Sequence, residues 1–127
     1  MSTDLFENAI FNFSWELRKN IMFLGNFFSV TVSADAYFPS EKVTEEQNES
    51  YKSFLENSTS IINNAENILV AEAGSKELAI ERFIPKMIKI KRNGDYAFLF
   101  DDKSDFENGI VVSIKPKLEI MSTDEYL

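Results

Sequence analysis

The segment Lys86-Met-Ile-Lys-Ile-Lys-Arg-Asn-Gly-Asp-Tyr-Ala-Phe-Leu-Phe100 decides the fold, because it predicts two strands joined by a tight turn. Apolar and charged residues alternate in its first half, as they do on a strand with one buried face. Asn93-Gly94 favours the two positive φ angles of a type I′ turn, which joins neighbouring antiparallel strands. The sequence therefore predicts a β-hairpin centred on these two residues.

A two-residue loop also predicts the register of the hairpin. Arg92 would face Asp95 and Lys86 would face Asp101, so that two pairs of opposite charge bracket the ladder. The side chains that we expect on the core face are then Ile88, Ile90, Ala97 and Leu99. The opposite face would carry Met87, Lys89, Lys91, Tyr96, Phe98 and Phe100.

Alternating apolar and polar residues predict further strands on both sides of this hairpin. The first strand would bury one face made of Phe11, Phe13, Trp15 and Leu17. A second alternation runs over residues 28–36, and Val- and Ile-rich segments at 110–115 and 117–121 follow the hairpin. Short turns between these segments favour antiparallel pairing.

Residues 44–83 have the apolar spacing of helices. Thr44 and Gln47 form the pattern of a capping box at the start. The poor helix formers at residues 57–60 predict a break, Gly74 predicts a stop, and Ser75 could cap a short third helix to Phe83. We expect one α+β domain over residues 1–127, with a mostly antiparallel sheet and two or three helices packed on one face.

Composition narrows the chemistry that we expect. The 127 residues contain neither cysteine nor histidine, so thiolate nucleophiles, disulfides and the commonest transition-metal ligands are missing. We predict no enzyme activity, no cofactor and no metal. The net charge of −8 disfavours nucleic acid and anionic membranes and favours a cationic protein partner. With no export signal and no apolar run of membrane-spanning length, the cytoplasm of a bacterium is the expected location.

The acidic segment from Asp101 to Gly109 invites two other interpretations. As an EF-hand loop it fails, because Lys103, Phe106 and Val112 occupy the third, sixth and twelfth positions. A carboxylate-dependent hydrolase or small-ligand site stays an alternative, although one surface loop seldom supplies two acids facing each other across a cleft. The simplest interpretation is a turn held by side-chain hydrogen bonds, with glycine returning the chain to the sheet.

The residues from Gly94 to Val112, with the closing segment 117–127, resemble a group of small bacterial domains of unknown function. Those domains end in a phrase similar to G-x-x-L-F-D-x-x-W-D-x-E-H-G, followed by a short strand. Trp15 and the T-E-E-Q helix start at residues 44–47 add to the resemblance. Ser104 and Asn108 depart from it, because the family has tryptophan and histidine there. Such domains are sometimes encoded beside polymorphic or contact-dependent toxins, so the resemblance implies an immunity-type protein.

We therefore expect a non-catalytic intracellular protein that binds a protein partner, such as a basic toxin, through acidic and aromatic surface. The expected contacts on the acidic segment and beside it are Tyr96, Asp101, Asp102, Asp105 and Glu107. A second expected acidic patch on the first helix consists of Glu45, Glu46 and Glu49. A structural homo-oligomer is the other alternative, for which an exposed apolar face on residues 110–114 would be the sign.

Overall fold

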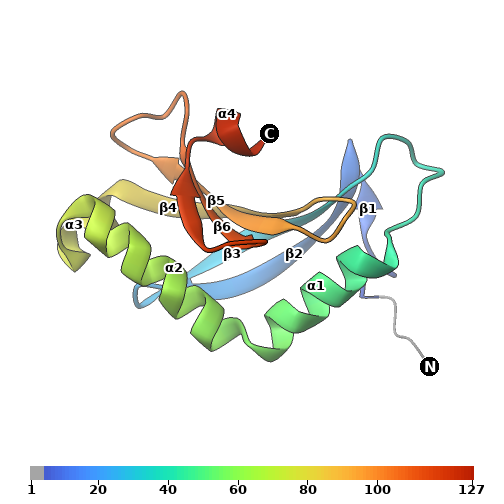
Figure 1. The fold of residues 1–127 in the computed structure, drawn as a ribbon, viewed down its shortest axis with the longest axis horizontal. Coiled ribbons are helices and arrows are strands. Elements are labelled where there is room, and N and C mark those ends of the chain that lie inside the picture. The colour runs from blue at the N-terminus through green and yellow to red at the C-terminus, as the bar shows by residue number, and fades with distance from the viewer. Residues whose placement is uncertain (1–4) are drawn as a thin grey trace.

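The computed structural model describes residues 5–127, which form one seven-stranded sheet with helices on both faces (Figure 1). The strands lie in sequence order and are β1 (Ile10–Phe11), β2 (Ser14–Phe23), β3 (Asn26–Asp35), β4 (Phe83–Ile90), β5 (Tyr96–Asp102), β6 (Ile110–Lys115) and β7 (Glu119–Met121). All neighbours are antiparallel except β3 and β4, which are parallel. The helices inserted between these two strands supply the long connection that a parallel pair needs. The predicted α+β class and mostly antiparallel sheet are confirmed.

Three helices cover one face of the sheet: α1 (Glu45–Glu56), α2 (Ser58–Ala73) and α3 (Lys76–Arg82) (Figure 1). The Thr44 hydroxyl accepts from the Gln47 amide, and the Gln47 side chain accepts from the Thr44 amide, so the predicted capping box is present. The helices break at Asn57, and Gly74 ends α2 in the left-handed conformation. Ser75 caps α3 as expected. The helical region therefore has three helices.

The main core lies between these helices and the sheet. Phe54 of α1 packs edge-on against Phe98, and Phe98 against Phe100, with ring centroids 5.7 and 6.2 Å apart. Phe83 at the start of β4 is buried as well. Truncating one such buried ring to alanine typically costs about 3 to 5 kcal/mol, so these aromatics account for much of the packing energy.

The predicted register of the β4–β5 hairpin is wrong by one residue. Lys91 donates to the Asp95 carbonyl at 2.8 Å, so the loop has three residues and ends in Gly94, at a φ of 93°. Ile88 and Ile90 consequently lie across from Phe98 and Tyr96 and share their face. A one-residue slip moves every side chain of one strand to the other face, which is why Ala97 and Leu99 leave the main core. The Lys86–Asp101 ion pair nevertheless forms, at 3.2 Å, where a bulge interrupts β4.

The first strand also differs from the prediction. It is split into β1 and β2 by a tight turn at Asn12-Phe13, where Phe13 has a φ of 63°. Phe13 is 92% exposed, whereas Ser14 is buried and hydrogen-bonded to Ser33 at 2.7 Å. The alternation therefore holds for Trp15 and Leu17 only, and Phe13 is not a core residue.

The second face of the sheet has a smaller apolar cluster. The short C-terminal helix α4 (Thr123–Tyr126) places Tyr126 against Ala97, Leu99 and Val111. The Tyr126 hydroxyl donates to the Lys89 carbonyl at 2.9 Å, which fixes the helix on the sheet. None of the helices formed by residues 5–127 is long and apolar enough to cross a membrane.

Candidate functional site

Asp102 is the one carboxyl group among residues 5–127 that is buried, with 3% of its surface exposed. Both of its oxygens accept hydrogen bonds from Arg82, at 2.9 and 3.0 Å, and Oδ1 also accepts from Ser104. The Arg82 guanidinium lowers the pKa of this carboxyl from 3.8 to about 2, assisted by Ser104. Asp102 thus holds β5 to the end of α3 and is not available as a surface contact.

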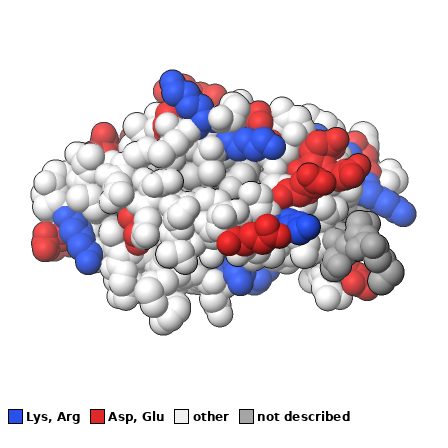
Figure 2. All heavy atoms as spheres, turned by 60° about the horizontal axis from the view of Figure 1, so that its bottom comes forward, with Lys and Arg blue, Asp and Glu red and all other residues white. Residues whose placement is uncertain are grey.

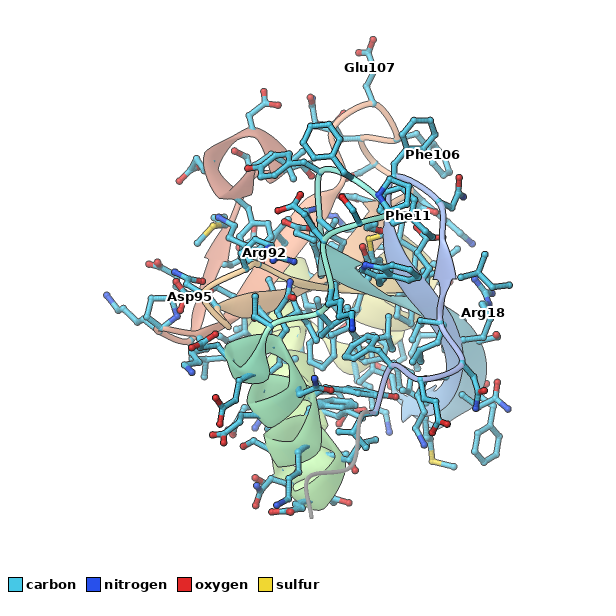
Figure 3. All side chains as sticks on the ribbon, turned by 90° about the vertical axis from the view of Figure 1, so that its right-hand side faces the viewer. Phe11, Arg18, Arg92, Asp95, Phe106 and Glu107 are labelled. Atoms are coloured by element: carbon cyan, nitrogen blue, oxygen red, sulfur yellow. The ribbon has the colours of Figure 1, made fainter. Side chains whose placement is uncertain are left out.

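The rest of the acidic segment forms the expected turn. Asp105 accepts from Asn108 through its carboxylate, at 3.0 and 3.2 Å, and from Gly109 through its carbonyl, at 3.0 Å. Gly109 has a φ of 64°, and a Cβ there would lie 2.8 Å from the Phe100 carbonyl oxygen. These contacts show that the segment is a turn held by hydrogen bonds. Figure 3 shows Glu107 pointing away from the molecule at the tip of the loop, beside the exposed ring of Phe106.

Tyr96 does not lie beside these acids, contrary to our expectation. It begins β5, whereas Asp101 and Asp102 end it, so the length of the strand separates them. Tyr96 is buried, and burial raises the pKa of its hydroxyl to about 12. Together with Glu49 and Ser50 of α1 it lines an open depression of about 500 Å³. The structure therefore brings Tyr96 to the second predicted patch, on α1.

The acids of that second patch follow each other on the exposed side of α1. Glu45 and Glu46 occupy the first helical turn, where the positive end of the helix dipole favours them, and Glu49 follows one turn later. All three side chains are exposed. Figure 2 shows acidic groups gathered toward the end of the molecule where α1 begins, while the middle of this face, over α2, carries few charges.

Large apolar side chains lie exposed at the same end of the sheet. Tyr37 is 82% exposed and Phe38 is 64% exposed, and both lie in the loop that follows β3. Because Ser14 pairs with Asp35, the β1–β2 hairpin ends beside this segment and adds the exposed side chains of Ile10 and Phe13. We call the surface formed by these residues and the acids of α1 the aromatic–acidic end: Ile10, Phe13, Tyr37, Phe38, Glu45, Glu46 and Glu49.

Hydrogen bonds fix the backbone of the loop that carries Tyr37 and Phe38. Glu41 Oε1 accepts from the main-chain amides of Tyr37 and Phe38, at 2.7 and 3.1 Å. The Trp15 indole donates to the Glu41 carbonyl at 2.6 Å. Arg92 donates to the carbonyls of Asp35 and Lys42, at 3.1 and 2.9 Å, at the two ends of the loop. The backbone of the loop is thus fixed while its rings face solvent.

The aromatic half of this surface was not predicted from the sequence. Tyr37 and Phe38 lie past the end of a regular alternation and before Pro39, so they belong to no strand pattern. Two adjacent aromatic residues in a loop are the signal that could have identified them. Buried aromatic residues usually belong to the periodic apolar pattern of a strand or helix, and these two do not. Phe13 was assigned to the core by an alternation that the turn interrupts.

The signs expected for the two alternative functions are not found in the part of the chain that the structure describes. Residues 5–127 contain no pair of buried acids across a cleft and no group of three or more acidic side chains arranged to hold a metal. On β6, Val111 and Val112 are buried between neighbouring strands, so residues 110–114 present no exposed apolar face. These alternatives gain no structural support.

No protein-family model, curated protein or solved structure matches the chain. The resemblance to small bacterial domains of unknown function therefore stays a prediction.

Proposed function

We propose that this protein is a non-catalytic protein-binding domain that contacts its partner through the aromatic–acidic end. The observation that supports this proposal is the loop of Tyr37 and Phe38, whose rings are exposed while Glu41 fixes its backbone. Exposing large aromatic rings on a monomer is unfavourable, and contiguous apolar patches of this kind are typical of interaction sites.

The physical properties of this end suit a protein interface. Aromatic side chains make the largest contributions where they fill pockets at the centre of an interface. A loop that is already ordered loses little conformational entropy on binding, which leaves more of the contact energy as affinity. Glu45, Glu46 and Glu49 lie in the first part of α1, the helix that follows the aromatic loop in the chain, and the whole chain has a net charge of −8. A basic partner would therefore be attracted before the rings engage.

A cationic toxin fits these requirements, and the immunity-type function that the family resemblance implies is included in this proposal. Neutralisation would follow if the aromatic–acidic end covered the basic surface with which such a toxin binds its own target. The bacterial cytoplasm, expected from the cysteine-free sequence, remains a prediction about location.

A photo-crosslinking experiment in the native host tests the proposal. A benzophenone amino acid is placed at position 38 or, as the matched control, at position 27. Phe27 is 75% exposed but lies at the start of β3, at the opposite end of the sheet. We expect one dominant crosslinked protein of high isoelectric point from position 38 and none from position 27. Equal crosslinking from both positions, or an acidic captured protein, would contradict the proposal.

A further inference from the structure

The β2 strand has an open edge over most of its length. β1 pairs only with Trp15 and Glu16, so residues 17–23 have no neighbouring strand on that side within residues 5–127 (Figure 1). Figure 3 shows Arg18 at the outer rim of the sheet, on the side away from Asp95. Seven residues of extended chain span about 24 Å, which is enough for a complete additional strand.

The backbone groups that face outward on this edge can be identified. The Ser14 carbonyl accepts from Asn12 at 2.8 Å, so the polar groups of Ser14 point toward the β1 side. β2 pairs with β3 without a register shift, and successive residues of a strand direct their N–H and C=O groups to alternate sides. The N–H and C=O groups of Arg18, Asn20 and Met22 therefore point to the open edge.

A groove runs beside this edge. It has a volume of about 310 Å³ and lies between β2 and the first half of α2. Its apolar lining includes Ile21, Phe54 and Ile62, and the polar side chains of Ser58, Thr59 and Asn63 form its α2 side. An open strand edge next to a helix, with an apolar pocket between them, is the arrangement by which several domains bind extended peptides as an extra strand.

Charge indicates what such a peptide would carry. Lys19 lines the groove and forms no ion pair with any carboxylate of residues 5–127. Arg18, in contrast, is directed across the sheet and donates to the Thr31 hydroxyl at 2.6 Å. The carboxylate of Glu66 accepts from the Leu24 amide at 2.6 Å and is thereby engaged. The cation left for a ligand is therefore Lys19.

We propose that the β2–α2 groove binds an extended peptide as an eighth strand on β2, with an apolar side chain in the pocket and a neighbouring carboxylate on Lys19. A second copy of this chain fits less well. Symmetric pairing of two β2 edges would bring both Arg18 and both Lys19 side chains into one seam between two proteins of charge −8. Lysine on an edge strand is a feature by which proteins avoid such self-pairing. This site is separate from the aromatic–acidic end and does not depend on the function proposed for it.

A display library of random dodecapeptides, selected on the purified protein, tests the proposal. We expect enriched peptides with β-branched residues in alternation, one large apolar side chain and an acidic residue close to it. Binding of the best peptide should protect the Arg18, Asn20 and Met22 amides from hydrogen exchange. Every second residue of the bound peptide would direct its main-chain N–H group toward β2. N-methylation of the peptide at those residues should abolish binding, whereas N-methylation at the residues between them should leave binding unchanged.

Two variants of the protein serve as controls. Lys19→Glu should weaken the selected peptide at least about tenfold, and exchanging the acidic residue of the peptide for lysine should restore binding to this variant. Tyr37→Ser should leave peptide affinity unchanged. Failure to enrich any peptide, equal effects of both N-methylation sets, or light scattering that shows a dimer lost in Lys19→Glu would overturn the proposal.

Discussion

The Glu41 carboxylate accepts a hydrogen bond from the main-chain amide of Tyr37 at 2.7 Å, and this contact orders the loop that exposes the rings of Tyr37 and Phe38. A hydrogen bond to a charged acceptor contributes more than one between neutral groups. The aromatic surface is therefore held in place before any partner binds.

Substituting Glu41 with alanine should loosen this loop without unfolding the protein. We expect faster hydrogen exchange at the Tyr37 and Phe38 amides. The free energy of unfolding should fall by at most about 2 kcal/mol, since the loop is exposed. Exchange measured by NMR is the test. Glu56→Ala, which removes an exposed acid on α1, is the control, and unchanged protection of both amides in Glu41→Ala would contradict this account.

Gly94→Ala should be more costly than Gly25→Ala. Both glycines have positive φ, 93° and 85°, so each substitution carries the strain of a left-handed L-residue, roughly 1 to 2 kcal/mol. Only at Gly94 would the new Cβ also approach the Glu46 carbonyl and the Ser50 hydroxyl to 3.0 Å. The difference between the two midpoints of urea unfolding measures this close approach of the hairpin to α1. Equal midpoints would show that the contact is unimportant.

Asp102 should make the stability of the protein depend on acid pH. Its pKa of about 2 in the folded protein lies below the usual 3.8, so its contribution is complete above pH 3.8 and is lost as the pH falls toward 2. The shift corresponds to about 2 kcal/mol. The difference in unfolding free energy between wild type and Asp102→Asn should shrink across this interval. A difference that stays constant from pH 5 to pH 2 would refute the role assigned to Arg82.

A charged side chain at position 47 should destabilise the protein. Its buried amide donates to the carbonyls of Asp35 and Ile90, at 3.0 and 3.1 Å, and so joins α1 to β3 and β4. Gln47→Glu replaces the donor with a carboxylate facing two carbonyl oxygens, and we expect a loss of roughly 3 kcal/mol at neutral pH. Burial would raise the pKa of the new carboxyl, so the loss should diminish on acidification. Exposed Asn64→Asp is the control, and a loss in Gln47→Glu that does not depend on pH would contradict this assignment.

The helices could be predicted closely from sequence because local groups determine their ends. Thr44 and Gln47 satisfy each other's main-chain amides, and Gly74 adopts a conformation that other residues avoid. Two features differed: Phe83 begins β4 where the sequence suggested the end of α3, and the short helix α4 was not predicted.

The sheet was harder to predict, because register depends on more than the turn residues. Asn93-Gly94 fits a two-residue loop, but a three-residue loop with Gly94 in the left-handed region fits it too. The three-residue loop lets the Ser50 hydroxyl donate to the Gly94 carbonyl at 2.5 Å, a tertiary contact that the sequence does not reveal. It also moves Tyr96, Phe98 and Phe100 to the helix-covered face.

The candidate site was only half predictable. The acids of α1 were identified from the helix start, but nothing local indicated that Tyr96 lies near them or that Asp102 is buried against Arg82. Phe13, Tyr37 and Phe38 lie at the same end of the sheet because Ser14 pairs with Asp35, a relationship between distant parts of the chain.

Affinity for the crosslinked partner, measured by calorimetry with purified proteins, tests the central claim most directly. The double variant Tyr37→Ser with Phe38→Ser should bind at least about a hundredfold more weakly than wild type, since interface aromatics commonly contribute 2 kcal/mol or more. Phe27→Ser, which removes a comparably exposed ring at the other end of the sheet, should bind as wild type does. Equal affinities of the double variant and wild type would contradict the assignment of the aromatic–acidic end as the binding surface.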